Sequence, residues 1–295
     1  MELIISNLSK TYTNGVKALN NINLSIPQGM FGLLGPNGAG KSTLMRTIAT
    51  LQDADSGSIF LDDLNVLENK QGVREKLGYL PQDFGLYPRI TAEVMLDHIA
   101  QMKGVHNRSD RKNLVETLLH KVNLYSHRKK ALGTYSGGMR QRFGIAQALA
   151  GNPSLIIVDE PTAGLDPSER NRFYNLLSEL GENTIVILST HIVEDVSTLC
   201  SRMAIICEGE LLMEGKPREG IEALNGKIYQ KIINKDELDH YKNQYHVIST
   251  KLIEGKLNMH IESDIYLEEG FEPTAPGLED VYFSHIAKKV DPITI

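Results

Sequence analysis

GPNGAGKST, residues 35 to 43, is the stretch that decides the fold of this 295-residue chain. It follows the apolar run MFGLL and leads into LMRTIATL, so a strand, a glycine-rich turn and a helix are predicted in succession. Glycines let a backbone fold around an anion because no Cβ atom obstructs it. Amides at a helix N-terminus then point at that anion. The stretch therefore predicts a loop that binds phosphate groups.

The side chains of this loop predict a nucleotide together with a cation. We expect Lys41 to place its charge between the β- and γ-phosphates, Ser42 to offer a hydroxyl to Mg²⁺, and Thr43 to reach the α-phosphate. An ordinary glycine-rich turn gives no reason for Lys41 and Ser42 to occur together at its end. The predicted nucleotide-binding residues of the loop are Gly35, Asn37, Gly38, Ala39, Gly40, Lys41, Ser42 and Thr43.

A second motif, LIIVDEP at residues 155–161, predicts a buried strand that ends in two carboxylates. Asp159 is expected to bind Mg²⁺ through water, and Glu160 to orient or deprotonate the water that attacks the γ-phosphate. An acidic strand end is common and by itself favours no function. The phosphate loop elsewhere in the chain makes the catalytic interpretation the better one.

Composition limits the classes of protein to which the chain can belong. Hydrophobic residues make up 41% and charged residues 23%, which is typical of a globular protein. The net charge of -6 argues against a nucleic-acid partner, because such binding depends on Lys and Arg. No stretch approaches the roughly 20 apolar residues that a membrane helix needs. Cys200 and Cys207 lie in or beside apolar segments and are predicted to be buried free thiols.

The order of apolar patterns predicts an α/β chain with two parts. From residue 1 to about 217, strands alternate with helices, which favours a mostly parallel sheet covered by helices. Residues 86–152 are predicted to form a helical insert, and residues 202–217 a hairpin that turns at Gly209. Residues 218–295 are predicted to form a small α+β appendage that ends in a helix. The other predicted strands are residues 3–12, 20–27, 30–35, 57–63, 155–160 and 184–190.

With these motifs in this order, residues 1 to about 217 resemble the ATP-binding cassette (ABC) family of P-loop ATPases. The resemblance implies a mixed sheet with a helical subdomain, and ATP with Mg²⁺ as ligands. It implies that Tyr12 stacks on adenine and that Gln82, in GYLPQD, reaches the metal and the attacking water. It also implies that Asp166, in GLDP, lies at a dimer contact and that His191, in STHIVED, holds the γ-phosphate and Glu160.

Each of these residues has an ordinary alternative when it is taken alone. Tyr12 could be a surface aromatic on a strand, Gln82 a solvated loop residue, and His191 a core histidine. Because all the motifs occur in the family's order, it is improbable that every one of these alternatives holds at once. The predicted catalytic residues are Lys41, Gln82, Glu160 and His191, and the predicted Mg²⁺ ligands are Ser42, Gln82 and Asp159.

The stretch YSGGMRQR, residues 135–142, resembles the family's signature motif. In the family this motif faces a nucleotide bound by the phosphate loop of a second subunit, so two chains are expected to pack head to tail around two ATP molecules. Ser136, Gly137 and Gly138 match the usual Leu-Ser-Gly-Gly-Gln, whereas Tyr135 and Met139 depart from it. Met139 stands where the family has a glutamine, so the hydrogen bond of that glutamine side chain is not expected here. Ser136 can equally serve as a plain helix cap.

The resemblance implies a subunit that drives a separate membrane permease from the cytoplasmic face of the cell membrane. The ending PGLEDVYF, residues 276–283, resembles that of bacterial exporters with a separate permease, and an identical second chain is the expected ATPase partner. The main alternative is a non-transport cassette protein acting on ribosomes or DNA. Such proteins usually carry two cassettes or a long coiled coil, and the sequence shows neither.

Two other phosphate-loop classes fit the sequence less well. A GTPase would need a guanine-reading Asn-Lys-x-Asp motif, but the nearest stretch, NKDE, has Glu237 where Asp belongs and lies outside the nucleotide region. A small-molecule kinase gives no reason for the signature stretch.

Overall fold

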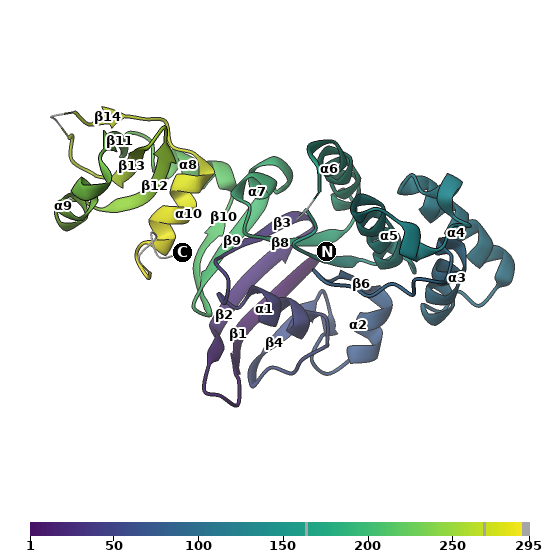
Figure 1. Ribbon diagram of the computed structural model, residues 1–295. Coiled ribbons are helices and arrows are strands. Elements are labelled where there is room, and N and C mark those ends of the chain that lie inside the picture. Colours follow the sequence, from purple (N-terminus) through teal and green to yellow (C-terminus); the bar gives the residue numbers. More distant parts are fainter. Residues whose placement is uncertain (163–164, 268–269, 291–295) are drawn as a thin grey trace.

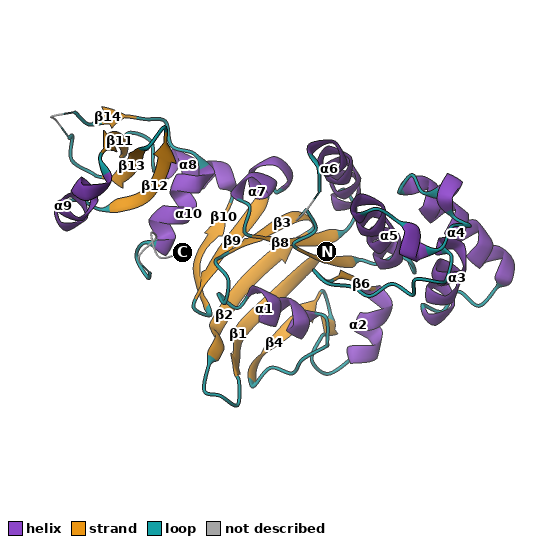
Figure 2. Ribbon diagram, viewed as in Figure 1, coloured by secondary structure: helices purple, strands orange, loops and turns teal. Residues whose placement is uncertain are grey.

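Three β-sheets organise the chain in the computed structural model, which describes residues 1–162, 165–267 and 270–290 (Figure 1). A six-stranded sheet lies at the centre and a four-stranded antiparallel sheet lies beside it. A second four-stranded sheet forms the appendage at one end of the molecule, and a group of helices lies at the opposite end (Figure 2). The site predicted from the sequence lies on the central sheet.

The central sheet has the strand order β10-β9-β3-β8-β7-β6, and only the β9–β10 pair is antiparallel. Its strands are rich in Leu, Ile and Val because both faces of the sheet are covered. In β7, Leu155 and Ile157 pack on one side, and Ile156 and Val158 on the other. The strands are β3 (Gly29–Leu34), β6 (Leu77–Leu80), β7 (Leu155–Asp159), β8 (Ile185–Thr190), β9 (Arg202–Cys207) and β10 (Glu210–Gly215).

The remaining strands of the first 65 residues form a separate antiparallel sheet of order β2-β1-β4-β5. The expectation that the early strands belong to one mostly parallel sheet is therefore wrong for residues 3–12, 20–27 and 57–63. The physical reason is the short loop at residues 12–16, which returns the chain antiparallel to itself. The strands are β1 (Glu2–Thr11), β2 (Lys17–Pro27), β4 (Ser56–Leu61) and β5 (Leu64–Asn65).

The two sheets enclose helix α1 (Lys41–Ile48) in one apolar cluster, which includes Leu44 and Ile48 of the helix and Ile157 of the central sheet. The opposite face of the central sheet packs against α6 (Pro167–Gly181) and α7 (Val193–Leu199). The phosphate loop thus runs from a central strand directly into a helix that is fixed between two sheets.

Helices α3 (Ala92–Met102), α4 (Arg108–Lys121) and α5 (Gly137–Leu149) gather at the end of the molecule away from the appendage (Figure 2). Helices α3 and α4 each begin after a capping residue. The side chains of Thr91 and Asn107 accept hydrogen bonds from amides of the first turn. A short helix, α2 (Lys70–Lys76), precedes β6. In the described ranges no helix is long and apolar enough to cross a membrane.

The appendage sheet has the strand order β12-β13-β11-β14. The last helix of the appendage packs against the rest of the chain. Val281 and Ile286 of that helix share an apolar cluster with Val196 of α7. The cluster is continuous with the core beneath the central sheet. The elements are α8 (Pro217–Ala223), β11 (Ile228–Ile233), α9 (Leu238–Gln244), β12 (Val247–Ile253), β13 (Lys256–Glu262), β14 (Glu272–Pro273) and α10 (Leu278–Ile286).

Several local expectations are confirmed. The predicted hairpin is formed by β9 and β10, and Gly209 lies in its turn with a positive φ of 75°. Cys200 and Cys207 are buried free thiols, and burial raises the pKa of each.

Gly32 on β3 offers a test of how tightly α7 is held against the central sheet. A Cβ atom at this position would lie 2.6 Å from Cγ1 of Val196. We expect Gly32→Ala to lower the free energy of unfolding by about 1–3 kcal/mol, because the core is already filled. Urea unfolding monitored by circular dichroism measures this. Gly85→Ala, which meets open space, is the control and should shift stability by about 0.5 kcal/mol or less. Equal stability of the two variants would contradict the tight packing.

Candidate active site

The register of the parallel strands brings the predicted motifs to one edge of the central sheet. Leu34, the last residue of β3, pairs with Thr190 at the end of β8. Asp159, the last residue of β7, pairs with Ser189 of β8. The residues that follow these three strand ends are Gly35 of the phosphate loop, Glu160 and His191. Three segments far apart in the sequence therefore leave the sheet side by side.

The phosphate loop closes onto its own lysine. Lys41 Nζ donates hydrogen bonds to the carbonyl oxygens of Gly35 at 2.5 Å and Pro36 at 3.1 Å. Burial lowers the pKa of Lys41, and the nearby carboxylates of Glu160 and Asp159 oppose that shift. The loop thus has a buried cation at its centre, suited to binding phosphate oxygens.

Glycine is required where the loop enters helix α1. Gly40 has a φ of 106°, and a Cβ atom there would lie 2.3 Å from the carbonyl oxygen of Ala18. Any other residue would push the loop away from β2. Because Gly40 has no side chain to cap the helix, the first amides of α1 stay available to an anion.

Two of the other predicted catalytic residues, His191 and Gln82, contact the Glu160 carboxylate. His191 Nδ1 lies 3.1 Å from Glu160 Oε1, and Gln82 Nε2 donates to Glu160 Oε2 at 3.4 Å. Glu160 has a left-handed backbone with φ of 46°, a conformation that costs about 1–3 kcal/mol for a residue with a side chain. This backbone, together with the two partners, holds the carboxylate at the edge of the sheet.

One pocket of about 360 Å³ contains most of the predicted residues. Val16 and Ala18, which the sequence did not single out, also line it. The Tyr12 hydroxyl lies 3.0 Å from Thr43 Oγ1 of helix α1, so the ring lies next to the phosphate loop. The predicted residues in the lining are Tyr12, Asn37, Gly38, Ala39, Gly40, Lys41, Ser42, Thr43, Gln82, Glu160 and His191.

The side chains beside the phosphate loop have the oxygen donors that Mg²⁺ prefers. Ser42 offers a hydroxyl and Gln82 an amide oxygen in the same pocket, and Asp159 lies at the adjacent strand end. Burial raises the pKa of Asp159, and the nearby charge of Lys41 opposes that shift. Mg²⁺ in such sites is held by one or two protein groups and by the substrate's phosphates, so this donor set fits it.

The signature residues lie elsewhere. Ser136, Gly137, Gly138 and Asp166 do not line the phosphate-loop pocket. Ser136 is the N-cap of α5, where its Oγ accepts a hydrogen bond from the Met139 amide at 3.2 Å.

Tyr135 is buried, donates its hydroxyl to the His127 carbonyl at 3.0 Å, and packs edge-on against Phe143. Asp166 is exposed and caps α6, while Gly164 of the same GLDP motif lies outside the described residues.

One polar cluster beneath the site was not found from the sequence. Asp195 is fully buried and accepts hydrogen bonds from hydroxyls of Thr162, Thr190 and Tyr174. Its sequence signal was weak, because Asp195 is one of two adjacent carboxylates, with Glu194, in the first turn of α7.

Comparisons with known proteins identify this arrangement. The family model described as "ABC transporter" matches residues 19–163. The linearmycin resistance ATP-binding protein LnrL of Bacillus subtilis (strain 168) is 37% identical over 223 residues, covering 75% of this chain and 71% of LnrL. The chain belongs to the ABC transporter family. It is an ABC ATPase, with the nucleotide-binding P-loop of that family.

Two further comparisons describe how far the likeness extends. ABC transporter A family member 7 of Arabidopsis thaliana is 32% identical over 274 residues, and this ABC ATPase spans 85% of its own length but only 29% of that protein. The dimeric post-hydrolysis structure of the ATP-binding cassette MJ0796 bound to ADP and Pi aligns with a TM-score of 0.67 and 28% identity, covering 72% of this chain and 98% of that one.

Replacing Lys41 tests the position of the phosphate site. We expect Lys41→Ala to weaken ATP binding by roughly 10- to 150-fold, because a charge-assisted hydrogen bond contributes about 1.5–3 kcal/mol. Isothermal titration calorimetry measures the dissociation constant. The control is Lys70→Ala, which removes an exposed lysine paired with Asp53 and should leave affinity unchanged. Unchanged affinity in Lys41→Ala would place the nucleotide somewhere else.

Proposed function

We propose that this ABC ATPase works as a head-to-tail pair of chains that traps two ATP molecules and drives a separate membrane permease. The observation that supports the pair is the exposed N-terminus of α5. Amides in the first turn of a helix have no acceptor within the helix, and the first turn of α5 contains no acidic side chain. This anion-binding end does not line the chain's own phosphate-loop pocket. A second chain can supply the nucleotide that it lacks.

The link between α5 and α6 supports the same proposal. Arg142 of α5 forms an ion pair with Glu169 of α6, and the distance from Nε to Oε2 is 3.2 Å. Glu169 lies in the first turn of α6, next to the cap formed by Asp166. The Ser136 and Asp166 ends are therefore held together as one surface. The dimeric MJ0796 structure shows that a cassette of similar fold forms pairs.

The residues around Glu160 give hydrolysis a chemical route. We infer that Glu160 accepts a proton from water as the water oxygen bonds to the γ-phosphorus and the bond from phosphorus to the ADP oxygen breaks. Lys41 neutralises charge on the phosphates, and His191 keeps the Glu160 carboxylate oriented at 3.1 Å. Bound Mg²⁺, held by Ser42, Gln82 and Asp159, would neutralise further phosphate charge.

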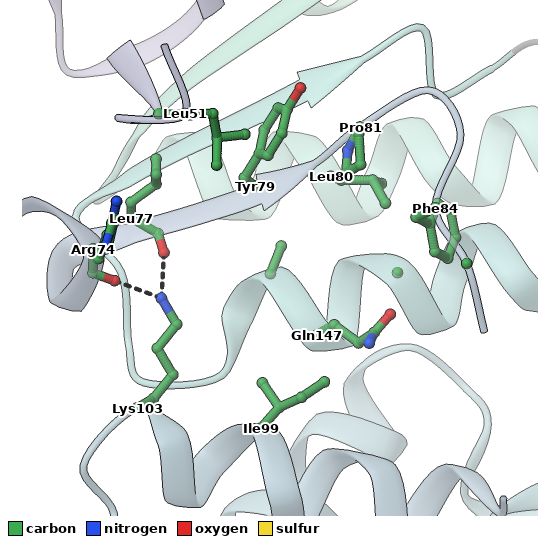
Figure 3. Close-up of a pocket in the computed structure, with 14 residues that line it drawn as sticks. Leu51, Arg74, Leu77, Tyr79, Leu80, Pro81, Phe84, Ile99, Lys103 and Gln147 are labelled. Atoms are coloured by element: carbon green, nitrogen blue, oxygen red, sulfur yellow. Dashed lines mark hydrogen bonds between the residues drawn. The ribbon is translucent and has the colours of Figure 1, made fainter. Parts of the chain in front are cut away.

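A second cleft, of about 350 Å³, is proposed to receive a helix of the permease (Figure 3). It lies between β6 and helices α3 and α5, and apolar residues such as Leu51, Phe84 and Ile99 line it. Lys103 Nζ donates to the carbonyls of Arg74 and Leu77 at 2.6 and 2.7 Å, which fixes one end of the cleft.

The chain connects this cleft to the nucleotide pocket through a single peptide bond. Pro81 lines the cleft, and the next residue, Gln82, lines the pocket and is bonded to Glu160. A permease helix that moves Pro81 will therefore move Gln82. This short connection supports coupling between ATP hydrolysis and the permease.

We propose that the transporter works in export, with this chain on the cytoplasmic face of the membrane. LnrL is an ATP-binding protein of linearmycin resistance, and the ending at residues 276–283 resembles that of exporter subunits. We propose that the second ATPase subunit is an identical chain.

Dimer formation is tested by trapping ATP. Glu160→Gln should still bind ATP but should hydrolyse it slowly, because the amide cannot accept the proton from water. Size-exclusion chromatography with light scattering should then show dimers at saturating ATP and monomers without nucleotide. Adding Lys41→Ala to Glu160→Gln is the matched control, and it should remove the dimer. Monomers of Glu160→Gln in saturating ATP would contradict the paired mechanism.

Ser136→Arg tests the role of the signature end separately from nucleotide binding. The large cation blocks the helix end that faces the second chain, so turnover should fall at least about 10-fold while the dissociation constant for ATP stays unchanged. Steady-state ATPase assays and calorimetry measure the two quantities. A normal rate in this variant would mean that the signature end faces solvent.

The permease cleft is tested by affinity purification from detergent-solubilised membranes of the source cells. The chain should recover an integral membrane protein. Leu51→Asp should reduce that recovery, whereas Ile232→Asp, which alters an equally exposed residue of the appendage, should not; their exposed fractions are 62% and 64%. Recovery of no membrane protein, or equal recovery by both variants, would count against this cleft.

A further inference from the structure

Asp195 joins the two loops that carry Glu160 and His191. Its Oδ2 accepts hydrogen bonds from Thr162 Oγ1 at 2.6 Å and from Thr190 Oγ1 at 3.1 Å. Thr162 lies two residues after Glu160, and Thr190 lies immediately before His191. One carboxylate oxygen therefore holds both loops from below the nucleotide pocket.

The other oxygen of Asp195 is fixed to helix α6. The Tyr174 hydroxyl donates to Oδ1, and burial together with this hydrogen bond raises the pKa of Tyr174, which keeps the phenol protonated as a donor. Asp195 has an exposed fraction of 0%, and none of the ion pairs in the described ranges includes it. A buried carboxylate that takes part in none of these ion pairs depends on its hydrogen-bond donors, so this arrangement resists rearrangement.

The loop after β8 is fixed by the same contact. Thr190 Oγ1, which donates to Asp195, also accepts a hydrogen bond from the Ile192 amide at 2.9 Å. His191 lies between these two residues, so its backbone is held in a closed turn. On the other side, the Glu160 amide donates to the Ser189 carbonyl at 2.9 Å. The backbones of both residues are thus anchored, and their side chains meet at 3.1 Å.

We propose that Asp195 is a positioning residue that sets the distance between Glu160 and His191, with Thr162 and Thr190 as the groups through which it acts. The inference rests on the catalytic roles proposed above for Glu160 and His191. In the described residues, none of the side-chain hydrogen bonds of this network reaches the phosphate loop, so we assign the network to the chemical step and not to the binding of ATP. Its loss should lower kcat and leave the KM for ATP unchanged.

The first test replaces Thr162 with valine in the full-length chain. Valine has nearly the same shape as threonine but cannot donate to Asp195. We expect kcat for ATP to fall roughly 10- to 100-fold, as for a catalytic group displaced by about 1 Å, with KM changed less than about 2-fold. The matched control is Ser284→Ala. It removes another buried hydroxyl, which donates to the Glu262 carboxylate at the same distance of 2.6 Å, but it lies in the appendage. Its kcat should equal that of the unmodified chain.

The second test asks whether Thr162 and Asp195 act as one unit. Asp195→Asn should lower kcat at least as much as Thr162→Val, and the double variant should be no slower than Asp195→Asn alone. The proposal would be overturned if kcat of the double variant fell by the product of the two single-variant factors. A normal kcat in Thr162→Val would overturn it as well. If Asp195→Asn does not fold, as judged by circular dichroism, the valine variant and its control still decide the question.

These outcomes can be separated from a failure of the proposed function. If Glu160→Gln retains normal turnover, the catalytic assignment itself is wrong. If Glu160→Gln is inactive while Thr162→Val has normal kcat, only the role of Asp195 is wrong. A rise in KM with normal kcat in Thr162→Val would also reject it, because that result would place the network in ATP binding.

Discussion

The alignment of three parallel strand ends is the constraint on which the rest of the site depends. Leu34 pairs with Thr190, and Asp159 with Ser189, so the phosphate loop, Glu160 and His191 all leave the sheet at one edge. Sliding any strand by one residue would turn its side chains to the opposite face and separate these groups. The buried apolar residues on both faces of β7 prevent such a slip. The core of the fold and the geometry of the candidate active site are therefore set by the same packing.

The edge of the sheet gathers the residues to which we assign ATP hydrolysis. Lys41 gives a buried cation, and Glu160 is held by Gln82, His191 and its own left-handed backbone. Beneath them, Asp195 connects the loops through buried hydroxyls. We propose that a second chain closes this pocket from the solvent side. The exposed helix end at Ser136 of that chain is suited to this task.

The sequence predicted the parts of this structure that depend on local pattern. The phosphate loop lies between β3 and α1 as its glycines and the flanking apolar runs indicated, and the β9–β10 hairpin turns at Gly209. The division of the early strands into a separate antiparallel sheet was missed, because apolar patterns do not reveal which strands pair. Asp195 was missed for a related reason: its partners lie on three segments that meet only in the fold. The packing of α10 onto α7 likewise depends on contacts that are distant in sequence.

The most direct test of the account mixes two variants that are each impaired in ATP hydrolysis. Lys41→Ala disables the phosphate loop and Ser136→Arg disables the signature end, so in a head-to-tail pair of one chain of each kind, both defects fall in the same site. The other site then contains an intact Lys41 from one chain and an intact Ser136 from the other. The account predicts that ATPase activity rises in the mixture well above the sum of the separate rates. A rate equal to that sum would contradict it.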